Sequence, residues 1–491
     1  MAVFAIAFLV SVGVVRAQEH PWFDDPGQPG HYAVGHTGYL FTDASRGNRP
    51  VYFMVWYPTD PNSITSSTPP AQYPLDPYTG STNLPITVSG DWEALGYDRA
   101  YEGPPPSQSK LFPLVMVSPG SSEDSWQLLF IGTRLASHGY VVASAEHWGD
   151  CQWPWDACDD PLTTMFNRPR DISFIITQLL QKSRTRGELL FRTIDPNKIA
   201  ASGHSMGGYT TYALAGGDKQ VCDTLFPVLF FGESLPYPTG DCVETPRDPR
   251  VKAIVLLDAI SDQALHYNEF ARIKVPSLIM GQTFDQMVGM FPDMGNWSAR
   301  PHRAIDRPDS YRVDVNGSNH ISYVVLCDAL PLFYNYGVFS ADDVQYYENN
   351  WPCASTGWDP VTISPADARL VITKYMIAFL DIYFHSQDAT PWLDWWILTP
   401  EYARSHTPTV QFFDSEDCHV ALPDRTYFRF RPYQTSNECD VAQKDPTGWF
   451  ASPSTSASGD VATPMTMAPA SAPNGTVLQL RKKPFSAARL D

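Results

Sequence analysis

Residues 203–208 read Gly-His-Ser-Met-Gly-Gly, a pattern that points to nucleophilic chemistry. The segment follows a short apolar run at residues 198–201 and precedes a stretch with helical spacing, which predicts a strand, a tight turn and a helix. A serine on such a turn projects its hydroxyl into a cleft, and small neighbours are needed because the turn is crowded. We therefore expect Ser205 to be a nucleophile; the competing interpretation is an ordinary glycine-rich loop.

A serine hydroxyl attacks efficiently only when a base removes its proton and an acid orients that base. Six histidines follow Ser205 in the chain. His320 comes one short turn after the strand expected at residues 311–315, which places it at the carboxyl edge of a sheet. His302 precedes that strand in a loop, and His385 falls in a helix. The sequence therefore favours His320 as the base.

Two aspartates are candidates for the acid. Asp285 follows the strand expected at residues 277–280, and Asp258 ends the strand expected at residues 251–257. Both lie at carboxyl ends of strands, where a carboxylate can reach His320. The sequence favours Asp285, with Asp258 as the alternative acid; aspartate at such a place also often caps a helix.

A negatively charged reaction intermediate needs two N–H donors aimed at its oxygen. The amide of Met206, directly after the nucleophile, is the first expected donor. The second is the amide of Ser121, in the loop of residues 118–122 that follows the apolar run at residues 114–117. We call residues 118–122 the oxyanion loop, although a Pro-Gly pair also occurs in plain turns.

The elements that would position these residues alternate between short apolar runs and helical segments. Strands are expected at residues 51–57, 114–117, 140–143, 198–201, 251–257, 277–280 and 311–315, and helices at 125–138, 166–181, 205–215 and 364–386. Ser364 is placed to cap the last helix, with Pro365 at its first position. The alternation predicts an α/β fold with a mostly parallel central sheet flanked by helices. Residues 58–113 are expected to form a surface excursion without a core strand, and residues 217–248 and 327–360 to be Cys-bounded insertions.

Composition narrows the class of protein. The chain has 491 residues, of which 43 % are hydrophobic and 18 % charged, so it can bury a substantial core. Its net charge of −19 disfavours nucleic acid and anionic membranes as partners. We expect no stable membrane insertion, and the sequence does not indicate the oligomeric state.

The chain divides into four segments by composition. Residues 1–17 are apolar and end in small residues before Gln18, which predicts a cleaved secretory signal and hence an extracellular protein; an N-terminal anchor is the alternative. Residues 18–412 are the expected catalytic domain and 413–450 a Cys-containing extension. Residues 451–491 are rich in Ser, Ala, Pro and Thr, which predicts a disordered tail.

The cysteines and glycosylation sequons fit an exported chain. All eight cysteines follow residue 17, and an even number in such a chain predicts disulfides. Pairing between neighbours is the simplest scheme: Cys151 with Cys158, Cys222 with Cys242, Cys327 with Cys353, and Cys418 with Cys439. Sequons at Asn296, Asn316 and Asn474 predict glycans in a eukaryotic host. No metal-binding spacing such as C-x-x-C or H-E-x-x-H occurs, so no metal is expected.

Five short segments occur in an order that resembles the α/β-hydrolase superfamily. They are Ser-Pro-Gly at 118–120, His-Gly-Tyr-Val-Val at 138–142, Ala-Glu-His at 145–147, residues 203–208 and Asn-His at 319–320. Platelet-activating-factor acetylhydrolases, dienelactone-hydrolase-like esterases and bacterial cutinases or polyester hydrolases are the most similar branch. The resemblance covers roughly residues 30–412. It implies an α/β-hydrolase fold with Ser205 as nucleophile and His320 as base. Leu-Asp-Ala at 257–259 is similar to the acetylhydrolase pattern, whereas the spacing from Gly281 to Asp285 matches the cutinases.

The function expected from these residues is a secreted serine carboxylic-ester hydrolase that works through an acyl-enzyme and needs no cofactor. Its expected substrates are small-molecule, lipid or polymeric esters, with platelet-activating-factor acetylhydrolase as the nearest resemblance. A cutinase, polyester hydrolase or lipase of the same fold is an alternative, as is an amidase or peptidase. A hydrolase-like protein that only binds is the alternative from a different class.

Overall fold

The computed structural model describes the following residues: 26–74, 77–78, 97–150, 159, 161–217, 226–227, 234–235, 247–260, 267–282, 299–305, 307–335, 337, 339–350, 363–385, 397–399, 402–403 and 410–413. The chain separates into a compact unit, Met1–Gly448, and a second unit, Trp449–Asp491, which lies outside the described residues. The expected signal at 1–17, the extension at 413–450 (apart from residue 413) and the tail at 451–491 also lie outside them.

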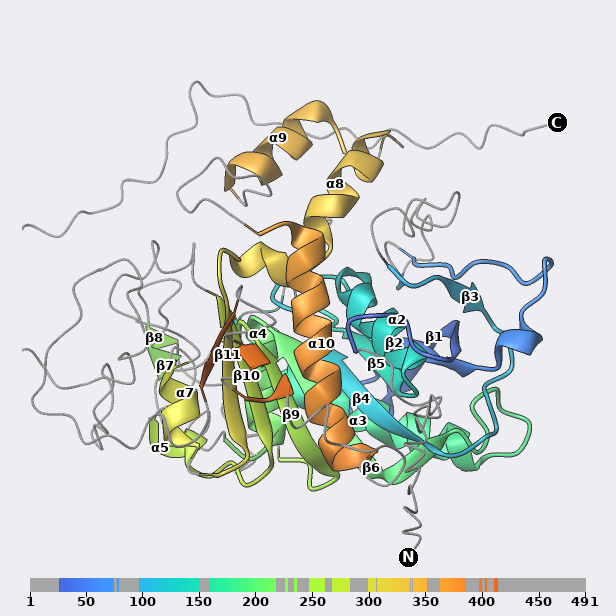
Figure 1. The fold of residues 1–491 in the computed structure, drawn as a ribbon, viewed down its shortest axis with the longest axis horizontal. Helices are drawn as coiled ribbons and strands as arrows, with labels where there is room; N and C mark the ends of the chain where they lie inside the picture. The colour runs from blue at the N-terminus through green and yellow to red at the C-terminus, as the bar shows by residue number, and fades with distance from the viewer. Residues whose placement is uncertain are drawn as a thin grey trace, which may run out of the picture. The chain divides into compact units, whose positions relative to one another are not determined.

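Ten strands of the described chain form one sheet in the order β12-β11-β10-β9-β6-β4-β5-β2-β1-β3 (Figure 1). They are β1 (Ala33–Asp43), β2 (Arg49–Thr59), β3 (Ala100–Glu102), β4 (Phe112–Ser118), β5 (Val141–Glu146), β6 (Ile194–His204), β9 (Val251–Leu257), β10 (Ser277–Gln282), β11 (Ser310–Val315) and β12 (Val410–Phe413). The six strands from β11 to β5 run parallel, whereas β2 pairs antiparallel with β1 and β5, and β12 with β11. Parallel strands are buried on both faces, which explains their continuous apolar runs.

Helices cover both faces of this sheet. The helices packed against it are α2 (Leu129–Ser137), α3 (Pro161–Arg184), α4 (Met206–Leu214) and α10 (Pro365–Phe384). In Figure 1, α10 crosses one face of the sheet beside α2, and α3 packs with α4 on the other. Ser364 accepts a hydrogen bond from the amide of Asp367, and Pro365 occupies the first turn, so the predicted start of α10 is confirmed. The predicted α/β fold with a mostly parallel sheet is also confirmed.

The remaining elements complete the described chain. They are the helices α5 (Tyr267–Phe270), α7 (Ala299–Ala304), α8 (Leu326–Asn335) and α9 (Ala341–Asn350), the 3₁₀ turns η1 (Ala44–Arg46), η2 (Pro61–Ser63), η4 (Ser125–Leu128) and η6 (His320–Tyr323), and the strands β7 (Phe226–Pro227) and β8 (Ser234–Leu235). Cys327 lies in α8, and the other cysteines lie outside the described residues, so the disulfide pairing stays a prediction.

The expectation for residues 58–113 is wrong in part. β3 pairs with β1 in the sheet, and Ala71, Tyr73 and Tyr97 join the hydrophobic core, each at most 5 % exposed. Their aromatic and small side chains supply apolar surface even though the surrounding composition is typical of a loop.

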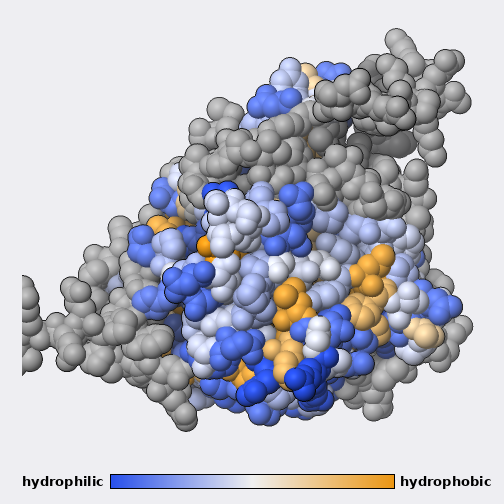
Figure 2. All heavy atoms as spheres, turned by 90° about the vertical axis from the view of Figure 1, so that its right-hand side faces the viewer, coloured by the Kyte–Doolittle hydropathy of each residue, from blue (hydrophilic) through white to orange (hydrophobic). Residues whose placement is uncertain are grey.

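The surface of the described residues combines hydrophilic and apolar side chains. The exposed large apolar side chains lie on separate elements: Leu40, Leu111, Trp148, Tyr334 and Leu370. Figure 2 shows one face on which apolar residues form small areas between hydrophilic ones. Within the described part of the chain, no helix combines the length and apolarity needed to cross a membrane.

Candidate active site

Ser205 lies between the last residue of β6 and the first residue of α4, with φ 52° and ψ −118°. A residue with a Cβ rarely adopts this region, so the backbone is strained here. The strand, turn and helix expected from residues 203–208 are therefore present. Ser205 is 8 % exposed, and its side chain caps no amide of α4.

Two glycines allow this turn to form. A Cβ on Gly207 would lie 1.9 Å from the carbonyl oxygen of Ser118, and one on Gly203 would lie 2.0 Å from that of Gly207. Both neighbours are backbone atoms that no side-chain rotation can move. The start of α4 therefore packs directly against the oxyanion loop, which brings Met206 and that loop to the same place.

The turn after β9 is joined to the turn of Ser205 by backbone hydrogen bonds. The amide of Ser205 donates to Leu257 O at 3.1 Å, and the amide of Ile260 donates to Ser205 O at 2.9 Å. Asp258 lies between these two contacts with φ 42°, a second strained position, and is 2 % exposed. Its Oδ2 also accepts from Gln282 Nε2 at 3.0 Å.

The turn after β11 brings His320 to the same edge of the sheet. Asn319 and Ser322 form a reciprocal capping box at the start of η6, which fixes His320 as its first residue. Tyr323 anchors the other end of η6 by donating to Gly281 O. His320 is 4 % exposed, and its Nδ1 contacts Oδ2 of Asp258.

The carboxylate that contacts His320 therefore belongs to Asp258, the alternative acid of the sequence analysis. The favoured acid, Asp285, lies outside the described residues. Contact between Nδ1 and a buried carboxylate leaves Nε2 as the nitrogen that can face a nucleophile, the arrangement a general base requires.

A second imidazole, that of His204, packs against His320. The ring centroids are 4.5 Å apart, and His204 Nε2 lies 3.1 Å from His320 O. Its Nδ1 lies 2.8 Å from Oε1 of Glu123, and Oε2 of Glu123 accepts from the amide of Gly120. The sequence analysis missed Glu123, because a single glutamate in a polar loop carries no signal of its own.

His204, Asp258 and His320 offer ligand atoms within 4.8 Å of one another, a spacing that also suits a metal ion. Their atoms already face other partners, however. His204 uses its two nitrogens toward Glu123 and His320 O, and His320 Nδ1 meets Asp258. A hydrogen-bonded network fits this donor set better than a metal centre.

Buried charges lie beneath the oxyanion loop. Arg168 of α3 is 0 % exposed and donates to Pro119 O, to Gly120 O at 3.3 Å and to Asp150. Asp150 Oδ1 in turn accepts from Ser121 Oγ at 3.0 Å. Burial lowers the pKa of the Arg168 guanidinium to about 9, while nearby carboxylates oppose the change.

His147 and Asp171 extend this network. His147 Nε2 lies 2.9 Å from Ser118 Oγ, and its Nδ1 lies 3.1 Å from Oδ2 of Asp171. Burial, with the charge of Arg168, lowers the pKa of His147 to about 3. Burial alone would raise the pKa of Asp171, but hydrogen bonds from His147 and Arg49 and their charges lower it. The sequence analysis noted His147 only as part of a motif and missed Arg168.

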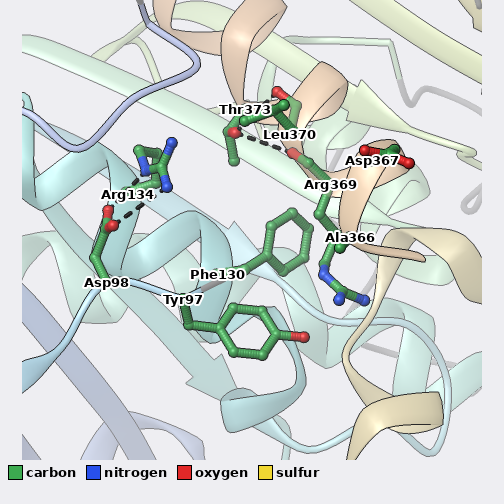
Figure 3. Close-up of a pocket in the computed structure, with 9 residues that line it drawn as sticks. All are labelled: Tyr97, Asp98, Phe130, Arg134, Ala366, Asp367, Arg369, Leu370 and Thr373. Atoms are coloured by element: carbon green, nitrogen blue, oxygen red, sulfur yellow. Dashed lines mark hydrogen bonds and ion pairs between the residues drawn. The ribbon is translucent and has the colours of Figure 1, made fainter. Parts of the chain in front are cut away.

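A separate cavity of about 200 Å³ lies between α2 and α10 (Figure 3). Tyr97, Phe130, Arg134 and Arg369 are among its lining residues, and none of the predicted site residues that the structure describes is among them. Arg134 is paired there with Asp98 at 2.7 Å.

The chain is similar over part of its length to three cutinases. It is 29 % identical over 111 residues to cutinase 1 of Thermobifida cellulosilytica and to the cutinase of Thermobifida fusca (strain YX), and 28 % identical over 110 residues to cutinase est1 of Thermobifida alba. Each match covers 22 % of this chain and about a third of the relative, 37 %, 32 % and 32 % respectively. No family model matches the chain.

A solved ferulic acid esterase from Streptomyces cinnamoneus matches with a TM-score of 0.47 and 21 % identity, over 78 % of this chain and 97 % of that one. The deciding features are in the chain itself: a mostly parallel sheet with helices on both faces, and a serine on a strained turn between β6 and α4. The fold is that of an α/β hydrolase. In this fold, the loops after β4, β6, β9 and β11 converge at the carboxyl ends of the parallel strands, where such sheets place their sites.

Proposed function

We propose that this α/β hydrolase is a secreted serine carboxylic-ester hydrolase that acts through an acyl-enzyme. One observation carries the proposal: the turn of Ser205 is hydrogen-bonded on both sides to the turn of Asp258, whose carboxylate contacts Nδ1 of His320. In this proposal, nucleophile, base and acid come from three turns at one edge of the sheet. The partial similarity to cutinases supports esters as the substrate class.

In the proposed mechanism, Ser205 Oγ attacks the ester carbonyl while Nε2 of His320 takes its proton. His320 then returns the proton to the leaving alcohol, and a water molecule repeats the sequence to release the acid. Asp258 holds the ring in the required tautomer and stabilises its charged form. The amides of Met206 and Ser121 hold the oxyanion, since α4 begins at Met206 without a side-chain cap.

Replacement of Ser205 tests the nucleophile. Ser205→Ala is expected to abolish hydrolysis of p-nitrophenyl acetate and labelling by a fluorophosphonate probe, with an unchanged circular dichroism spectrum. A hydrolase-like binding protein would leave the wild type unlabelled. Full turnover by folded Ser205→Ala protein would refute the mechanism.

Matched replacements distinguish the two acids. Asp258→Asn is expected to lower kcat by about 10⁴-fold, as the same change does in a well-studied serine protease triad, because the ring loses its orienting partner. Asp285→Asn is the control and is expected to stay near wild-type activity. Collapse of the Asp285 variant alone would reverse the assignment.

Two ester classes remain in competition within this proposal. The contact of Asp258 with His320 favours the acetylhydrolase-like arrangement, in which the acid follows the strand corresponding to β9. The sequence match favours cutinase-like polymeric esters. A panel from acetyl esters, including a phospholipid sn-2 acetyl ester, to long-chain and polymeric esters separates them by kcat/KM.

A further inference from the structure

Glu123 connects two parts of the site that are distant in sequence. One carboxylate oxygen accepts from the amide of Gly120 in the oxyanion loop, and the other meets His204 Nδ1 at 2.8 Å. His204 Nε2 then reaches His320 O at 3.1 Å. A continuous chain of hydrogen bonds therefore runs from the oxyanion loop to the backbone of the proposed base.

The partners of His204 determine its protonation state. A backbone carbonyl oxygen only accepts, so Nε2 must carry a proton toward His320 O. An ionised carboxylate also only accepts, so Nδ1 must carry a proton toward Glu123. Both nitrogens are donors, and His204 is therefore an imidazolium paired with a carboxylate.

The electrostatic surroundings agree with this assignment. Burial alone would lower the pKa of His204, but the charge and hydrogen bond of Glu123, together with the charge of Asp258, raise it. Burial alone would raise the pKa of Glu123, but the charge and hydrogen bond of His204 and the amide of Gly120 lower it. The groups that face His204 are Glu123 after β4, Asp258 after β9, and His320 and Tyr323 of η6.

We propose that Glu123 and His204 form a positioning ion pair that holds the oxyanion loop against the backbone of His320 and keeps a positive charge beside its ring. This inference rests on the proposed function of His320 as the base. The positive end of the pair is the nearer one, because the rings of His204 and His320 lie 4.5 Å apart while Glu123 meets the Nδ1 side of His204. The pair therefore links the position of the oxyanion loop to that of the proposed base.

Glu123→Gln separates the charge from the hydrogen bonds. The glutamine oxygen can accept from Gly120, and its amide can donate to His204 Nδ1. His204 then becomes neutral and retains its Nε2 proton toward His320 O. The hydrogen-bond geometry is kept, and the positive charge on His204 is lost.

The expected readout separates kcat from KM for p-nitrophenyl acetate. Glu123→Leu removes the hydrogen bonds to Gly120 and His204, so the oxyanion loop shifts and kcat is expected to fall about 10-fold, with KM changed by less than about twofold. Glu123→Gln keeps both hydrogen bonds and is expected to recover most of the kcat that Glu123→Leu loses. A purely structural role for Glu123 would lower kcat equally in both variants or act on KM.

The chain offers a matched control in the pair of His36 and Glu102. Its Nδ1 to Oε2 distance is also 2.8 Å, but β1 and β3 are separated from β6 by β2, β5 and β4. Glu102→Leu is expected to leave kcat near the wild-type value. Wild-type kcat in Glu123→Leu, no recovery in Glu123→Gln, or an equal loss in Glu102→Leu overturns the proposal.

Nitrogen-15 NMR of the histidine rings tests the pair without turnover. We expect two protonated nitrogens on His204 at pH 7 in the wild type and one in Glu123→Gln. A neutral His204 in the wild type overturns the inference even if the enzyme is active. A charged His204 in a protein that hydrolyses no ester would instead refute the proposed function and leave the ion pair standing.

Discussion

Arg168 is the buried charge on which the oxyanion loop depends most directly. Its guanidinium donates to Pro119 O, Gly120 O and Asp150, and its side chain is 0 % exposed. Arg168→Met keeps much of the volume but leaves the carboxylate of Asp150 and two backbone carbonyls without this donor. Removal of one partner from a buried ion pair costs about 3–5 kcal/mol, a large share of the roughly 5–15 kcal/mol by which domains are stable.

The same change should impair catalysis. Ser121 directly follows the two carbonyls that Arg168 holds, and loss of an oxyanion donor typically lowers kcat by about 10²–10³-fold. We expect Arg168→Met to lower kcat by about 10- to 100-fold with a smaller change in KM, since the loop is displaced rather than removed. Urea unfolding and ester hydrolysis measure the two effects on the same preparation.

A double-mutant cycle with Asp150→Asn isolates the ion pair. Arg168→Met with Asp150→Asn should cost less than the sum of the single changes by about 1 kcal/mol or more. Arg170→Met is the matched control: this partly buried arginine of α3 contacts Phe166 and is expected to change stability by under about 1 kcal/mol. The reasoning fails if Arg168→Met behaves like the control in both assays, or if the two changes are additive.

Three further predictions concern the backbone and the buried network. Gly207→Ala should inactivate the enzyme and lower its melting temperature, because the new Cβ would sit 1.9 Å from Ser118 O; wild-type activity would contradict the packing. Ser205→Gly should be more stable than Ser205→Ala by about 1 kcal/mol, since glycine relieves the strain at φ 52°, and equal urea midpoints would argue against strain. Burial holds the pKa of His147 near 3 in the folded protein. Below pH 6.5, the unfolded chain therefore binds a proton at this residue more readily than the folded protein does. Stability is therefore lost as pH falls from about 6.5 toward 3, by up to about 1.4 kcal/mol per unit from this residue, and His147→Gln should show a shallower slope.

The sheet and the turn of Ser205 were predictable because each leaves a local pattern in the sequence. A parallel strand buried on both faces is a continuous apolar run, and β9 has the bounds expected from that run alone. The turn of Ser205 requires glycines where another backbone segment approaches closely, as at Gly207. His320 was predictable because it follows β11 by one turn and parallel strands end at the same edge.

The choice between Asp258 and Asp285 could not be made in this way. Both follow neighbouring parallel strands, so spacing places both at the same edge. Spacing also does not reveal the backbone at Asp258, where φ is 42° and hydrogen bonds tie Leu257 and Ile260 to Ser205. Aspartate tolerates positive φ better than most residues, but nothing in a sequence says that a given aspartate adopts it.

The buried charged residues could not be predicted from the sequence either. Arg168 and Asp171 lie in a helix whose sequence is polar on average, and charged side chains in such a helix are usually exposed. Both are at most 1 % exposed because partners from β2 and the loops after β4 and β5 surround them. Their partners lie far apart in the chain, so no local pattern records the network.

The chain contains a second Ser-His-Asp arrangement, and it shows why geometry and not residue type identifies a nucleophile. Ser118, His147 and Asp171 are linked at 2.9 Å and 3.1 Å, yet each is only 1 % exposed. Ser118 Oγ also accepts from Arg168 at 3.3 Å, and an imidazole whose pKa is lowered to about 3 is a weak base. Ser205 differs in having a strained turn, the start of a helix beside it and a second loop packed against that helix. The same three residue types therefore hold the oxyanion loop in one place and, in the proposed function, attack an ester in the other.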